Sequence, residues 1–163
     1  MSATESKPFI LAALVAALRA NARRRPLWGV VSTAWLLDLN YRQVMQKIED
    51  GSLPLAFNIG TGKRRREPRI FSASVLELAF GIDNTIGATK KLSLPAAIDL
   101  ILPRRDLRST ELKRLLSCDE KQIHVLKKDW RITTQPKAKD GPNSFTVFSR
   151  ASVAAWLTQR RIT

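Results

Sequence analysis

Two consecutive helical patterns of apolar and polar residues run through "STAWLLDLNYRQVMQKIEDG", residues 32–51. Ser32 or Thr33 is the expected N-cap of the first helix. Its expected buried residues are Ala34, Trp35, Leu36 and Leu37. The short stretch "DLN" then predicts a turn, so the two helices form a helix-turn-helix.

The second helix of this pair has clearer limits than the first. Asp38 or Asn40 is its expected cap, and Gly51 is the expected stop. Val44 and Ile48 stand one helical turn apart and are expected to face the core.

A strand, a basic loop and a second strand follow. "LPLAFNI", residues 53–59, and "RIF", residues 69–71, are the strand candidates, and "SASVLELAF", residues 72–80, predicts a closing helix capped by Ser72 or Ser74. The loop between the strands gathers Lys63, Arg64, Arg65 and Arg66. Like charges this close repel one another, whereas a neighbouring polyanion would stabilise them. The order of elements is that of a winged helix, with the charges at the tip of the wing.

A second, weaker copy of this pattern lies further along the chain, about 77–79 residues on. "STELKRLLSCDEKQIHVLKKDWRI", residues 109–132, and "FSRASVAAWL", residues 148–157, parallel the earlier helices, with "PKAKDGPNS", residues 136–144, as a second wing tip. In this parallel the equivalents of Leu37, Gln43 and Val44 are Leu116, Gln122 and Ile123.

These patterns predict a mainly α fold with small β wings, built from tandem winged helix-turn-helix modules plus an N-terminal helix. The expected parts are an N-terminal packing or dimerisation helix (1–26), module 1 (27–82), a linker with a short helix (83–108) and module 2 (109–163). Within the linker, Pro95 suits the first turn of a helix and Pro103 ends it. "RRRPLWG", residues 23–29, is expected to be a basic turn.

The N-terminal segment "FILAALVAALRANA", residues 9–22, allows two interpretations. Its Ala-Asn-Ala ending mimics a signal-peptide cleavage site, but the leading region has no net positive charge and "RRR" follows at once. A packing helix is therefore preferred, and it is too short to span a bilayer. The apolar residues on one face of this helix are candidates for a homodimer contact or for bracing the modules, namely Leu11, Leu14, Val15 and Leu18.

The charge of the chain points to an anionic partner. The 163 residues carry 28 Lys and Arg against 14 Asp and Glu, a net charge of +14, and both halves are basic. The single cysteine excludes an intramolecular disulfide and suits a reducing cytoplasm. With one histidine as well, no Cys/His cluster for structural zinc is present, and no cofactor is expected.

The stretch "LLDLNYRQVMQKIEDGSLP", residues 36–54, resembles the DNA-binding unit of the excisionase and MerR-type regulator superfamily, and the resemblance covers residues 30–80. The matching features are a polar pair, a Val, an Ile, an acidic pair and Gly-x-Leu-Pro. The resemblance implies that Tyr41, Arg42 and Gln46 point into the major groove, with Gln43 at the helix start. It also implies that the wing lies on phosphates or in the minor groove. The second copy, residues 109–158, lacks the Gly-x-Leu-Pro ending, and no long dimerising helix follows the first.

Arg and Gln suit base edges because each makes paired hydrogen bonds, whereas phosphate contacts mainly position a protein. The alternative is an ordinary solvated helix face. The candidate DNA-binding residues are Tyr41, Arg42, Gln43, Gln46, Lys47, Lys63, Arg64, Arg65, Arg66, Arg69, Lys121, Gln122, His124, Lys127, Lys128, Lys137 and Lys139.

The aromatic residues and the cysteine are assigned mainly to packing. Trp35 and Trp156 lie in helical apolar patterns and are expected in the core, and Cys118 is expected to be a small buried side chain. Trp28 and Trp130 lie near turns, where stacking on a nucleotide is the less favoured alternative.

The sequence as a whole predicts a sequence-specific double-stranded DNA-binding protein of the cytoplasm and nucleoid. An accessory or regulatory role in a mobile element is the favoured setting: excisionase-like, a plasmid or phage regulator, or a replication or partition factor. Two alternatives stay open: an RNA-binding protein, and an adaptor for a recombinase, replication or transcription protein in which only module 1 binds DNA. No catalytic arrangement is visible around Tyr41 or His124, so an enzyme is not expected.

Overall fold

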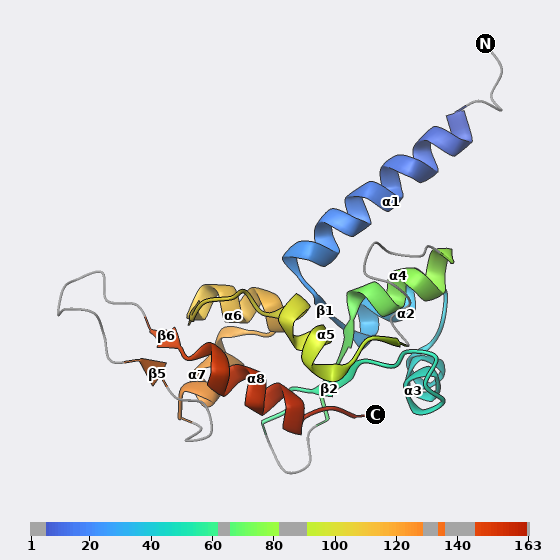
Figure 1. Cartoon of the computed structure of the whole chain (residues 1–163). Helices are drawn as coiled ribbons and strands as arrows, with labels where there is room; N and C mark the ends of the chain where they lie inside the picture. Colours follow the sequence, from blue (N-terminus) through green and yellow to red (C-terminus); the bar gives the residue numbers. More distant parts are fainter. Residues whose placement is uncertain (1–5, 62–65, 82–90, 129–133, 136–145, 163) are drawn as a thin grey trace.

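The computed structural model describes residues 6–61, 66–81, 91–128, 134–135 and 146–162. These residues form mainly helices with two small antiparallel sheets (Figure 1), which confirms the helix-rich fold with small β elements. The helices are α1 (Ser6–Arg24), α2 (Val30–Leu37), α3 (Tyr41–Glu49), α4 (Ser72–Phe80), α5 (Leu94–Ile101), α6 (Ser109–Leu116), α7 (Glu120–Lys128) and α8 (Arg150–Gln159). The strands are β1 (Leu27–Gly29), β2 (Ala56–Asn58), β3 (Pro68–Phe71), β4 (Leu107–Arg108), β5 (Thr134–Gln135) and β6 (Val147–Phe148).

One order of elements occurs twice. We call β1-α2-α3-β2-β3-α4 the first unit and β4-α6-α7-β5-β6-α8 the second unit. Each sheet has its last strand in the middle, in the orders β1-β3-β2 and β4-β6-β5. The register agrees as well, since Leu27 pairs with Phe71 in the first unit and Leu107 pairs with Phe148 in the second. The parallel seen in the sequence therefore extends to the arrangement of the strands.

Some helix ends lie where the sequence predicted them and others do not. Asn40 caps α3 as expected, and the residue after the C-cap of that helix is Gly51, with φ of 75°. The expected serine caps are wrong elsewhere, because α2 begins directly after Gly29 and α4 directly after Phe71, neither with a side-chain cap. In both places the helix follows a strand without an intervening turn, so β1 replaces the expected basic turn.

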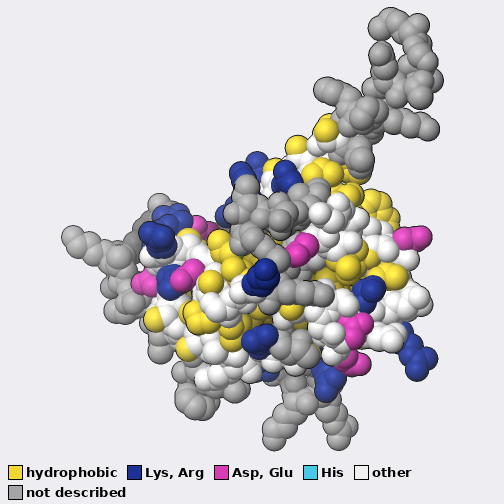
Figure 2. All heavy atoms as spheres, turned by 45° about the vertical axis from the view of Figure 1, so that its right-hand side comes forward, with side chains coloured by type: hydrophobic (Ala, Val, Ile, Leu, Met, Phe, Trp, Pro, Cys, Tyr) yellow, Lys and Arg dark blue, Asp and Glu magenta, His cyan; other side chains and the backbone are white. Residues whose placement is uncertain are grey.

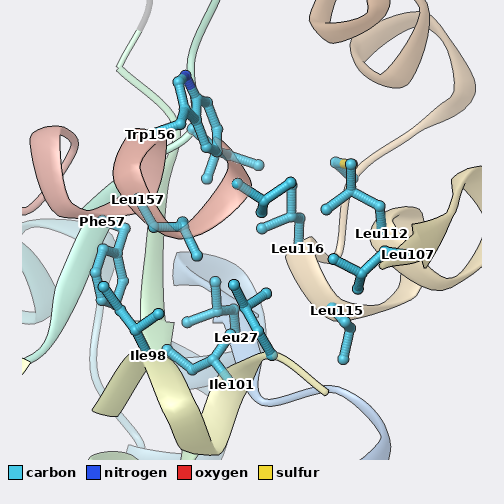
Figure 3. Close-up of a cluster of buried hydrophobic side chains, with 14 of the residues drawn as sticks. Leu27, Phe57, Ile98, Ile101, Leu107, Leu112, Leu115, Leu116, Trp156 and Leu157 are labelled. Atoms are coloured by element: carbon cyan, nitrogen blue, oxygen red, sulfur yellow. The ribbon is translucent and has the colours of Figure 1, made fainter. Parts of the chain in front are cut away.

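The first sheet separates two hydrophobic cores, because successive residues of a strand face opposite sides. Trp28 and Ile70 face a first-unit core, which contains Val44 and Ile48 of α3 and Val75 of α4. The other face contributes to a shared core, to which both units and α5 add side chains (Figure 3). Members of the shared core are Leu27, Phe57, Phe71, Ile98, Ile101, Leu107, Leu112, Leu116, Phe148, Trp156 and Leu157.

The described part of the segment expected to be a linker, from residue 91 on, is part of this packing. Ala97, Ile98 and Ile101 of α5 are buried in the shared core. Outside the core, Asp99 pairs with Arg150 of α8 at 2.5 Å between Oδ1 and Nη2. The two prolines predicted the helix itself, with Pro95 in its first turn. The two units consequently share a common interior.

The end of the chain adds an edge to the first sheet. The amide nitrogen of Ile162 donates to the carbonyl of Ala56 at 2.8 Å, and that of Asn58 donates to the carbonyl of Arg160 at 2.7 Å. The residues after α8 thus run antiparallel to β2 and cover its outer edge.

Helix α1 projects away from the rest of the protein (Figure 1). Its packing against the body comes from the C-terminal part, where Leu18 and Ala22 lie against the first-unit core. Leu14 is 49% exposed and Val15 is partly exposed. The described part of α1 therefore leaves apolar side chains in contact with solvent.

Candidate nucleic-acid interface

The expected reading helix, α3, is fixed at its start by a reciprocal cap. The backbone nitrogen of Gln43 donates to Oδ1 of Asn40 at 2.9 Å, and the backbone nitrogen of Asn40 donates to Oε1 of Gln43 at 2.8 Å. Asp38, in the left-handed conformation with φ of 52°, turns the chain from α2 into this cap. Gln43 therefore stands at the helix start as expected, but its side-chain oxygen is committed to the cap.

One face of α3 is fully covered and the opposite face is open. Val44 and Ile48 are 0% exposed in the first-unit core, which fixes the rotation of the helix. Tyr41, Arg42 and Gln46 are exposed, and Lys47 is half-buried. Arg42 and Gln46 thus stand one helical turn apart on the open side, and Tyr41 is exposed at the start of the helix.

Asn58 contacts both ends of the loop that is expected to form the first wing. Oδ1 of Asn58 accepts hydrogen bonds from the backbone nitrogens of Gly60, at 3.0 Å, and Glu67, at 2.9 Å. A further bond, from the Ile59 nitrogen to the Glu67 carbonyl at 3.0 Å, brings the two strands together below the tip. Arg66 is exposed at this base, whereas Lys63, Arg64 and Arg65 lie outside the described residues.

Arg69 has a different role from the one predicted. Its Nε donates to the Leu116 carbonyl at 3.0 Å and its Nη2 to the Ser117 carbonyl at 2.9 Å, while Nη1 reaches the carbonyl of Pro68 at 3.1 Å. The carbonyls of Leu116 and Ser117 lie at the C-terminal end of α6, where the helix dipole favours a cation. Burial lowers the pKa of Arg69, although Glu67 opposes this shift. Because its donors face the protein's own backbone, we remove Arg69 from the expected DNA contacts.

Gln122 is also engaged inside the protein. Its backbone nitrogen donates to Oδ1 of Asp119 at 2.8 Å, and its Oε1 accepts from the Asp119 nitrogen at 3.2 Å, as in the cap of α3. Its Nε2 donates to a carboxylate oxygen of Glu67 at the base of the first wing. Only 9% of Gln122 is exposed, so little of this side chain is available for the predicted contact with DNA.

The other candidates of the second unit remain open to solvent. Lys121, His124, Lys127 and Lys128 are all exposed on α7. Lys137 and Lys139, on the second candidate wing tip, lie outside the described residues. The α7 surface is therefore basic, but it lacks the amide and guanidinium groups that α3 presents.

The described tryptophans divide into one that lies opposite to expectation and two that are buried. Trp35 is 81% exposed instead of buried, because the side of α2 that contacts the core carries Val30 and Thr33. Trp28 is only 7% exposed in the first-unit core, which agrees with the favoured packing assignment and not with the alternative of stacking on a nucleotide. Trp156, at 1% exposure, is a core residue as predicted, and Trp130 lies outside the described residues.

Cys118 is buried as expected, at 9% exposure. Burial raises the pKa of its thiol to about 11, although nearby Arg69 opposes the shift. The thiol is therefore protonated at neutral pH, as suits a packing residue.

A groove of about 820 Å³ that the sequence did not indicate lies where α1, α2 and the wing base meet. Leu18 and Asn21 of α1 line one part of it, and Val31 and Trp35 of α2 line another. Toward the second unit its lining includes Ser117. The sequence signal for this surface was Trp35, which had been interpreted as a buried residue.

Comparison with known proteins does not identify a family, because no family model, curated protein or solved structure matches this chain. Among the described residues, the helices are too short or too polar for a membrane span. The same part of the chain contains no group of three His, Cys, Asp or Glu side chains suited to a metal ion.

Proposed function

We propose that the protein is a sequence-specific double-stranded DNA-binding protein built on tandem winged helix-turn-helix units, in which the first unit reads the bases. The observation that carries this proposal is α3. Its inner face is fixed by two fully buried residues while Arg42 and Gln46, which suit guanine and adenine edges, stand on the exposed face.

The wing supplies affinity in this proposal. The chain continues from the base held by Asn58 into Lys63, Arg64, Arg65 and Arg66, and a basic tip next to a reading helix suits the phosphates that flank a major-groove contact. The net charge of +14 favours fast encounter with DNA through long-range attraction. Base reading by α3 then selects among sites that the charge alone does not distinguish.

The second unit has a supporting role on this view. Its Gln122 holds Glu67 at the wing base, and Nη1 of Arg160 donates to the carbonyl of Gly60 at 3.2 Å on the other side of the wing. Both contacts come from the second unit and fix the base from which the basic loop extends. The exposed lysines of α7 add phosphate contacts without base preference.

We place the protein among accessory or regulatory factors, with mobile-element recombination, gene control, replication or partition as the setting. Such a factor binds DNA and leaves the chemistry to a recombinase, polymerase or replication protein. This part of the proposal rests on the excisionase-like motif of residues 36–54.

Selection from a random duplex library at near-physiological salt tests the proposal. We expect one enriched motif, retained in competition with structured RNA. Arg42→Ala should then weaken binding to that motif by about 1–3 kcal/mol and relax one base position. Arg104→Ala is the matched control, because it removes the same charge from an exposed site outside α3 and should leave the motif unchanged.

Three outcomes would contradict the proposal in different ways. Binding without an enriched motif would reduce the protein to a charge-driven binder. Preference for structured RNA would favour the RNA-binding alternative. If Arg42→Ala weakened binding to specific and to random DNA equally, the Arg42 side chain would contact a phosphate and not a base.

A further inference from the structure

The groove beside α1 reaches between the two parts of the first unit that are proposed to contact DNA. Tyr41, the first residue of α3, and Arg66, at the wing base, both line it. Arg42, the proposed base reader, directly follows Tyr41 in the chain. A duplex in contact with both α3 and the wing base therefore covers the groove.

Two kinds of side chain line this groove. Val31 and Trp35, one turn apart on α2, are each 81% exposed, and Leu18 of α1 adds further apolar surface. Arg25 and Arg66 are exposed basic residues of the same groove. Figure 2 shows hydrophobic side chains with Lys and Arg side chains beside them where α1 leaves the body. The groove thus combines apolar surface with positive charge.

Two further charged residues line the groove, and their charges offset each other. Burial lowers the pKa of Arg69, and attraction to Glu67 opposes that shift. The guanidinium of Arg69 donates to backbone carbonyls at the end of α6, and the Glu67 carboxylate accepts from Nε2 of Gln122. Arg25 and Arg66 therefore give the described lining of the groove its net positive charge.

A single strand of DNA backbone has the matching chemistry. Its phosphates are anionic while the C–H groups of its deoxyriboses are apolar, so charge and apolar surface alternate along it. One such strand separates the major groove of a duplex from the adjacent minor groove. A protein that places a helix in the major groove and a second element on the far side of that strand has the strand between the two elements.

We propose, on the basis of the DNA-binding function above, that the backbone strand between the two DNA grooves lies in this groove of the protein. Trp35 packs against deoxyribose, and Arg25 and Arg66 bind phosphates. Arg25 and Trp35 thereby set the position of α3 on the duplex without reading bases. A protein partner in the same place would cover Tyr41 and Arg66 and would therefore compete with DNA.

Equilibrium binding to the motif selected by the unmodified protein tests both contacts. Arg25→Ala should weaken binding about tenfold on the motif and on random DNA alike, because it removes a charged contact. The slope of log K against log salt should fall by about 0.9 for the one phosphate that is no longer neutralised. Trp35→Ala should weaken binding about fivefold with an unchanged slope, because the contact that it removes is apolar.

Two matched controls separate these contacts from changes elsewhere. Arg104→Ala removes an exposed charge and Leu100→Ala removes a half-exposed apolar side chain, and neither residue lines the groove. Both should bind the motif within about twofold of the unmodified protein. Trp35→Ala should also unfold in urea like the unmodified protein, since a side chain that is 81% exposed contributes little to packing.

Tryptophan fluorescence reports on Trp35 directly. Trp28 and Trp156 are buried, so Trp35 is the described tryptophan that acrylamide should quench. Adding the motif DNA should shield it from the quencher. Trp35→Phe keeps an apolar ring at this position, so it should still bind DNA, but its shielding signal should be lost. The difference between the two proteins isolates Trp35 from Trp130, which lies outside the described residues.

The possible results separate this site from the proposed function. If the unmodified protein selects no motif, the DNA-binding proposal fails together with this one. If it selects a motif that Arg42→Ala relaxes, but Arg25→Ala or Trp35→Ala binds like the controls, the strand does not lie in the groove and the proposed function stands. A Trp35 side chain that stays open to acrylamide in the complex overturns the site in the same way, and would leave the groove free for a protein partner.

Discussion

The two units repeat one order of elements, yet their second helices serve different purposes. In α3 the face beyond the cap carries Arg42 and Gln46, which are open to solvent. In α7 the equivalent cap carries Gln122, which is 9% exposed and contacts the wing base of the first unit. The same capping geometry therefore begins an open surface in one unit and an internal contact in the other.

The cores differ in a related way. The first unit has a core of its own on one face of its sheet and gives the other face to the shared core. The large buried side chains of the second unit, among them Phe148, Trp156 and Leu157, all belong to the shared core. The second unit thus depends on the first for its interior, while the first depends on the second for a fixed wing. A sequence repeat need not mean two independent modules.

The largest expected effect comes from damage to the shared core. Leu157→Ala removes a 0% exposed side chain from it and should lower the free energy of unfolding by about 3 kcal/mol. Because both units line this core, thermal or urea unfolding should remain one cooperative transition at the lower stability. Leu100→Ala removes the same atoms from a 47% exposed site and should change stability by less than about 0.5 kcal/mol. A split into two transitions would show that the units fold separately.

A smaller loss is expected from Arg69, which joins β3 of the first unit to the end of α6. Arg69→Met keeps the length of the side chain but leaves the carbonyls of Leu116 and Ser117 without these donors. Because buried acceptors without a donor destabilise the folded state, the variant should lower the free energy of unfolding, measured with urea, by about 2 kcal/mol.

Two controls separate the Arg69 contact from charge alone. Arg69→Lys keeps the charge without the planar fork, so it should restore only part of the loss. Arg66→Ala removes an exposed positive charge three residues away and should leave stability unchanged. If Arg69→Met were as stable as the unmodified protein, the contact would be incidental to the docking of the units.

Local signals in the sequence predicted the helices better than they predicted how the strands pair. Asn40 with Gln43, Val44 with Ile48, and Pro95 each belong to a short pattern whose physical meaning is complete within one or two turns. Strands β1 and β4 were not expected, because runs of three and two residues show no period. They pair with β3 and β6, which lie about forty residues further along the chain.

The candidate site was predicted where a residue's role depends on its own helix, and missed where it depends on the other unit. Arg42 and Gln46 are exposed as expected. Arg69 and Gln122 looked like equally good nucleic-acid contacts, since nothing near them in sequence reveals an acceptor 47 or 55 positions away. The prediction that Trp35 is buried was wrong for a related reason. Helix α2 is apolar on several sides, and its composition does not show which side contacts the core.

The smallest expected effect concerns what the second unit adds to DNA binding. Replacing Lys121, Lys127 and Lys128 with Ala should weaken binding to all sequences by about 1 kcal/mol in total and leave the preferred motif unchanged, because exposed lysines contact phosphates without reading bases. The slope of log K against log salt should fall by about 0.9 for each phosphate that the variant no longer neutralises. Alanine at Lys63, Arg64, Arg65 and Arg66 is the comparison, and it should lower the slope further if the first wing carries more of the contacts. An unchanged slope for the α7 variant would mean that the second unit does not touch DNA, and its basic surface would then be free for a protein partner.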